Sequence, residues 1–104
     1  MTMKPITDKA EVSIDFPDKA YMGSFGRGSA YEAHADEAGI VLKLARHGGE
    51  KRVVELHLHY YLLAEIVAEL ARSVKHRPPI DTAHREPLQE AVAALQAALE
   101  KRKG

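Results

Sequence analysis

The chain has 104 residues, 45% of them hydrophobic and 29% charged, and its fifteen basic residues balance fifteen acidic ones. This length predicts a single domain with a modest core. Because the chain has no cysteine, disulfides, thiolate nucleophiles and cysteine-based zinc sites are excluded. No apolar run approaches the roughly 20 residues of a membrane-spanning helix, and residues 1–10 lack the apolar segment of a secretory signal. We therefore expect a soluble cytoplasmic protein without a membrane segment.

The first part of the chain predicts a tail and a short strand. Residues 1–10 are polar and without periodicity, which is typical of a flexible N-terminal tail. Val12, Ile14 and Phe16 then alternate with polar residues up to Pro17, which predicts a strand over residues 11–16. The glycine-rich stretch 23–28 lacks the neighbouring elements and the lysine of a phosphate-binding loop. We expect it to be a flexible or bulged connection, and its role is not defined by the sequence.

Two hairpins follow, and the apolar pattern predicts their register. Residues directly opposite each other in an antiparallel pair lie on the same face of the sheet. Matching the apolar sets places Leu44 opposite Val54 and Leu42 opposite Leu56, with Gly48-Gly49-Glu50 as the loop. The preceding turn, Asp36-Glu37-Ala38-Gly39, places Ala33 opposite Leu42 and Tyr31 opposite Leu44. The opposite face then carries a row of Glu32, Lys43 and Glu55, in which a lysine lies between two carboxylates.

The segment 52–74 organises the chain, because its apolar period changes from two to about three and a half. Val54, Leu56 and Leu58 predict a strand with one buried face. From Tyr60 onward the apolar residues follow helical spacing, which predicts a core helix over residues 60–75. This helix ends before Pro78, because proline disfavours a helical conformation in the residue that precedes it.

A second helix is predicted over residues 87–103, after a proline-containing linker at 77–86. Pro87 suits its first turn, and the basic residues at 101–103 suit the negative end of its dipole. Its apolar residues step by four, three and four, as in a coiled-coil seam. This candidate interface is Leu88, Val92, Leu95 and Leu99. Such a stripe must be covered, either by the core helix of the same chain or by a second subunit, and we favour the second subunit.

Together these elements predict an α+β domain. A three- to four-stranded antiparallel β-meander is followed by two α-helices, one of them packed on the sheet. Residues 11–76 form the meander and the core helix, with strand 11–16 at an edge of the sheet. The predicted core is Ile14, Phe16, Tyr31, Leu42, Leu44, Leu56, Leu58, Leu62, Ile66, Leu70 and Val74.

Histidines are the sharpest chemical candidates, since neutral imidazoles bind zinc, copper or nickel. The candidates are His34, His57 and His59, which the register places on one face of the sheet. His34 and His57 lie two strands apart, about 9 to 10 Å at the backbone, and a third ligand is not evident. We therefore expect histidines that titrate near neutrality, with no bound metal and no cofactor.

A second candidate is a basic patch around the proline linker, formed by Arg72, Lys75, Arg77 and Arg85. It could meet phosphates of a nucleic acid, but a chain without net charge lacks the usual electrostatic footprint. No serine has a nucleophile-elbow context, and we predict that the protein is not an enzyme. The expected function is that of a small interaction or regulatory module that works as a homodimer or binds a protein partner through its C-terminal helix.

Overall fold

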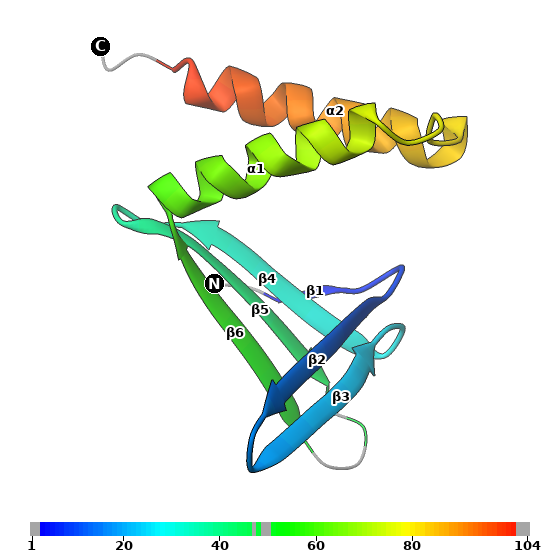
Figure 1. Ribbon diagram of the computed structural model, residues 1–104, viewed down its shortest axis with the longest axis vertical. Coiled ribbons are helices and arrows are strands. Elements are labelled where there is room, and N and C mark those ends of the chain that lie inside the picture. Colours follow the sequence, from blue (N-terminus) through cyan, green and yellow to red (C-terminus); the bar gives the residue numbers. More distant parts are fainter. Residues whose placement is uncertain (1–2, 47, 49–50, 102–104) are drawn as a thin grey trace. The chain divides into compact units, whose positions relative to one another are not determined.

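The computed structural model describes residues 3–46, 48 and 51–101, and its elements confirm the α+β class (Figure 1). The strands are β1 (Lys4–Pro5), β2 (Ala10–Phe16), β3 (Lys19–Phe25), β4 (Ser29–Ala35), β5 (Gly39–Arg46) and β6 (Arg52–His59). The helices are α1 (Tyr60–Lys75) and α2 (Thr82–Leu99). The chain forms two compact units, Met1–Val67 and Ala68–Gly104, and the boundary between them lies within α1.

Strands β4, β5 and β6 form the predicted antiparallel meander, and its register is confirmed. Leu42 pairs with Leu56 and with Ala33, and Leu44 pairs with Val54 and with Tyr31. Lys43 lies between Glu32 and Glu55, and its Nζ is 3.5 Å from Glu55 Oε1. The predicted loop Gly48-Gly49-Glu50 lies, apart from Gly48, outside the described residues.

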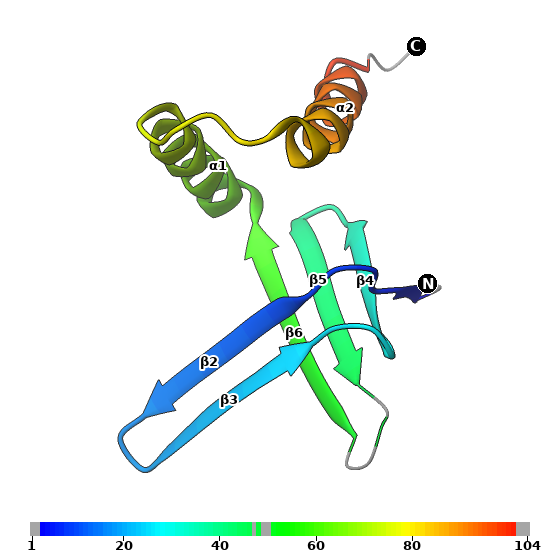
Figure 2. The same cartoon turned by 90° about the vertical axis from the view of Figure 1, so that its right-hand side faces the viewer.

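The position predicted for strand 11–16 was wrong. It does not join the edge of the meander but pairs with β3 in a separate two-stranded sheet, in which Val12 lies opposite Gly23. The fourth strand of the main sheet is instead β1, which adds to β4 within the segment expected to be a tail. Figure 2 shows the β2–β3 hairpin crossing the main sheet obliquely.

Strand β3 was missed because glycine interrupts its apolar alternation. Only Tyr21, Gly23 and Phe25 alternate on its inner face, and the sequence therefore indicated a loop. In the structure the Tyr21 side chain lies over Gly23, where an added Cβ would be 2.8 Å from Tyr21 Cζ. Only at Gly28, with a φ of 92°, does this stretch need a left-handed conformation, in the turn closed by the hydrogen bond from Ser29 N to Gly26 O.

Two arginines of the main sheet hold the hairpin. The guanidinium of Arg46 lies 5.9 Å from the centre of the Phe25 ring and donates a hydrogen bond to Ser24 O. The guanidinium of Arg52 lies 5.1 Å from the centre of the Tyr21 ring. Each cation–π contact contributes on the order of 0.5 to 1 kcal/mol at a partly exposed site. Phe25 is fully buried, so this end of the sheet is the best-packed part of the first unit.

The predicted core was wrong for a single chain. Leu56, which lies at the centre of the predicted apolar face, is 51% exposed. The hairpin covers this face only in part, and no other described strand lies over the remainder. The exposed members of the predicted core are Phe16, Tyr31, Leu42, Leu56, Leu62, Leu70 and Val74. The apolar residues share faces as the sequence predicts, but one chain does not bury those faces.

The structure confirms both predicted ends of α1 but neither predicted end of α2, which ends at Leu99 and not at residue 103. Helix α1 covers residues 60–75 as predicted. Helix α2 begins at Thr82, earlier than expected, because Asp81 caps it and accepts a hydrogen bond from His84 N. The hydrogen bond from the His84 side chain also lowers the pKa of Asp81. Pro87 therefore lies inside the helix instead of in its first turn.

Gly39 is the described glycine at which an added side chain would meet neighbouring backbone most closely. It is buried, and a Cβ there would lie 2.8 Å from His59 Cα, a backbone atom that cannot rotate away. We expect Gly39→Ala to lower the free energy of unfolding by about 1 to 3 kcal/mol, as overpacked sites do. Urea unfolding measures this change. Gly48→Ala is the matched control, since a Cβ at Gly48 meets no described atom within 4 Å. Equal stability of the two variants would contradict the crowding of Gly39.

Candidate functional site

The turn between β4 and β5 carries a hydrogen-bonded polar cluster that contains Asp36, His57 and Tyr60. Asp36 Oδ1 accepts hydrogen bonds of 2.8 Å from the backbone N–H groups of Ala38 and Gly39. The Tyr60 hydroxyl donates to Asp36 O at 2.6 Å, and Tyr60 N donates to Ala38 O at 3.3 Å. The turn therefore fixes the first residue of α1 beside the start of β5, which explains how β6 passes into the helix without a loop.

The backbone hydrogen bonds from Ala38 and Gly39 hold the pKa of Asp36 below its usual value, and His57 adds a smaller effect in the same direction. His57 Nε2 lies 3.2 Å from Asp36 Oδ2. The carboxylate thus has two roles. It closes the turn, and it positions one of the candidate histidines.

The three candidate histidines lie on the predicted face but engage different partners. His34 Nδ1 lies 2.9 Å from Glu32 Oε2, whereas His57 contacts Asp36. The ring centres of His57 and His59 are 4.9 Å apart. Among the described residues, no three side chains of histidine, cysteine, aspartate or glutamate gather closely enough to hold a metal ion. The arrangement offers ion pairs rather than a coordination site.

The basic patch is spread along the second unit. Arg72 pairs with Glu69 one turn earlier on α1, so its charge is partly neutralised. Lys75 ends α1, Arg77 follows it in the linker, and Arg85 lies in the first turns of α2. Arg85 also lines an apolar groove beside Leu88. Arg72 and Lys75 supply cations in the last turn of α1, where the helix dipole favours them, whereas Arg85 lies near the opposite, N-terminal end of α2.

The predicted α2 stripe is exposed along its whole length. Leu88, Val92, Leu95 and Leu99 are 53%, 54%, 56% and 76% exposed. At the linker end, Leu88 and Val92 line a groove of about 530 Å³ together with Val74 and Ile80. The end of α1 therefore faces the start of the stripe without covering it. A monomer leaves an apolar surface of the kind that usually marks an interaction site.

A second apolar surface was not predicted from the sequence. Residues of β2 and of the segment before it enclose, together with β4, β5 and β6, a groove of about 680 Å³. Leu42, Leu56 and Ile14 are among its lining residues. The alternating pattern predicted which residues share this face. It did not predict that the hairpin covers the face incompletely, because strand β3 was not recognised in the sequence.

Neither helix in the described part of the chain is long and apolar enough to cross a membrane. Comparison of the sequence with protein-family models, with curated proteins and with solved structures gave no match.

The lowered pKa of Asp36 predicts a contribution to acid unfolding. Because the folded-state pKa is depressed, the contribution is fully present above the unfolded value of about 4 and is lost as the pH falls through the folded value. We expect the urea midpoint of the wild type to fall more between about pH 5 and pH 2 than that of Asp36→Asn, which cannot titrate. Glu37→Gln, in the same turn, is the control. A wild-type profile parallel to that of Asp36→Asn would contradict the role of this carboxylate.

Proposed function

We propose that this chain is a small cytoplasmic interaction or regulatory module that works as a homodimer through α2. The observation that supports the proposal is the continuous exposure of the α2 stripe, in which each of the four apolar residues is more than half exposed. A second copy of the same helix is a suitable cover, because the 4,3,4 spacing is that of a coiled-coil seam. A two-fold contact also lets one stripe cover its own copy.

The composition of α2 favours close approach of a second helix. Ala91, Ala94 and Ala98 flank the stripe, so two such helices can pack with little steric hindrance. Two heptads alone form a marginal coiled coil, and the contact therefore depends on the rest of each subunit for stability. This dependence suits a module whose assembly responds to concentration or to a partner.

Nucleic-acid binding through the basic patch has weaker support. Its residue Arg72 is paired with Glu69, and the chain as a whole has no net charge. Retention on DNA that weakens steeply with salt and is lost on replacing Arg72, Lys75 and Arg77 would favour this alternative instead.

The proposal predicts that Leu95→Asp weakens self-association. Placing a carboxylate in the seam should raise the dissociation constant by about tenfold or more, which size-exclusion chromatography with light scattering measures as a loss of mass over a concentration series. Ala97→Asp is the matched control, because it adds the same charge to α2 two residues away and off the stripe. A wild-type mass of one chain, 11.5 kDa, at high micromolar concentration would contradict the homodimer, as would equal effects of the two variants.

A further inference from the structure

Strand β6 is an open edge of the main sheet. It pairs with β5 on one side, and no described strand pairs with it on the other. It has eight residues and contains no proline, and Val53 and Leu56 are about half exposed. Natural proteins shorten, charge or cover such edges, because an open strand recruits other strands. Strand β6 is one of the two longest strands of the sheet, and its open hydrogen-bonding edge favours pairing with another strand.

From this edge we propose that β6 pairs antiparallel with β6 of a second copy, about a two-fold axis through Leu56. This contact is distinct from the α2 interface and does not depend on it. It joins two four-stranded sheets into one continuous sheet of eight strands.

The pattern of faces restricts the register. Directly opposite residues of an antiparallel pair lie on the same face. To keep the apolar faces of both copies on the same side of the joined sheet, the two-fold axis must therefore pass through a residue and not between two residues. A centre at Glu55 would place that carboxylate against its own copy. A centre at Val54 would place Arg52 against Leu56, and a centre at His57 would leave only residues 55–59 paired before α1 begins.

A centre at Leu56 avoids these faults. It pairs residues 53–59 of both copies and places Val54 opposite Leu58 on the apolar face. On the polar face it places Glu55 opposite His57 of the second copy, twice by symmetry. Glu55 lies beside Lys43 and is exposed, and His57 lies beside Asp36 and is also exposed, so both can reach across the edge. A carboxylate and an imidazole at facing positions form a favourable cross-strand polar pair, and this pairing favours one register over the others.

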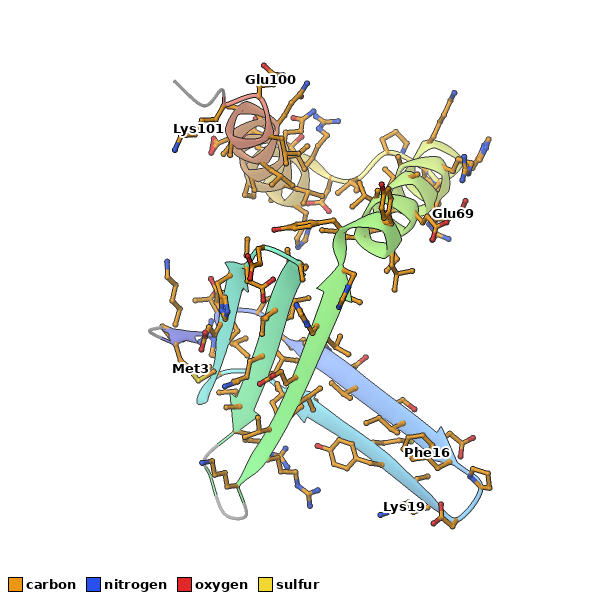
Figure 3. All side chains as sticks on the ribbon, turned by 90° about the vertical axis from the view of Figure 1, so that its left-hand side faces the viewer. Met3, Phe16, Lys19, Glu69, Glu100 and Lys101 are labelled. Carbon is orange, nitrogen blue, oxygen red and sulfur yellow. The ribbon has the colours of Figure 1, made fainter. Side chains whose placement is uncertain are left out.

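The β2–β3 hairpin gives an independent reason for a second copy. Phe16 and Lys19, at its tip, lie beyond the edge of β6 (Figure 3). Phe16 is on the inner face of the hairpin, with Ile14 and Tyr21, yet it is 56% exposed because the sheet beneath it has ended. Extending the sheet by a second copy puts strand β6 of that copy under the hairpin, with the end that carries Leu58 nearest to the tip. The tip of the hairpin that projects past β6, here called the overhang, would then pack on an apolar surface that a single chain lacks.

Disulfide trapping tests this register, because the chain contains no cysteine. Facing residues of an antiparallel pair have Cα atoms about 4.5 to 5.5 Å apart, within the range for a disulfide. Leu56→Cys should therefore form a covalent dimer on mild oxidation. Val54→Cys is the matched control, since its two copies would lie about 13 Å apart. A mixture of Val54→Cys and Leu58→Cys chains should cross-link to each other, which provides a second test if Leu56→Cys folds poorly. Absence of both cross-links, or equal cross-linking of the control, would overturn the proposal.

The overhang has its own test. Phe16→Ser should raise the dissociation constant of the β6 contact by about tenfold, whereas Met22→Ser, on the outer face of the same hairpin and 80% exposed, should leave it unchanged. The two variants are compared by light scattering in the Leu95→Asp background, which isolates the β6 contact from α2. Cross-linking of Leu56→Cys that persists in that background would support the β6 contact even if α2 contributes nothing. Equal effects of Phe16→Ser and Met22→Ser would overturn the role of the overhang.

Discussion

The main constraint on this fold is that the register of β4, β5 and β6 places their large apolar side chains on one face. Every inward residue of one strand lies opposite an inward residue of the next, from Tyr31 through Leu44 to Val54. A one-residue slip would transfer this whole set to the polar side, so the register is strongly specified. This register also gathers a large apolar face, and leaving that face in contact with water is unfavourable.

The chain covers this apolar face only in part. The β2–β3 hairpin lies across the sheet and is held there by Arg46 and Arg52 on the rings of Phe25 and Tyr21. The inner face of the hairpin has few large aliphatic side chains, because Gly23 has no side chain and the ring of Tyr21 lies over it. The result is a groove of about 680 Å³ that leaves Leu56 half exposed. A domain of about 100 residues has a modest core, and the exposed groove leaves a large part of its apolar surface in contact with water.

The sequence predicted those elements whose evidence is local. The period change near Tyr60 gave the start of α1, and matching the apolar sets gave the register around Leu42. It failed at β3 because the pattern there is carried by Tyr21 and Phe25 around a glycine, which in isolation indicates a loop. It also failed at the start of α2, because Pro87 was placed in the first turn, whereas in the structure Asp81 caps the helix and Pro87 lies inside it. In both cases a single residue with a strong local preference concealed a longer element.

Burial could not be predicted in the same way, because periodicity shows which residues share a face and not what covers that face. The candidate histidines illustrate this limit: the register correctly placed His34 and His57 on either side of Val41, while the contact of His57 with Asp36 depends on the turn geometry. The α2 stripe has the helical periodicity of a core helix, and the sheet face has the strand periodicity of a core sheet. Both apolar surfaces are nevertheless exposed in a single chain. A stripe that repeats every three or four residues on a helix matches another helix, and an open strand edge matches another strand. The α2 stripe and the edge of β6 are therefore suited to different kinds of contact, and the proposed second copy would supply both.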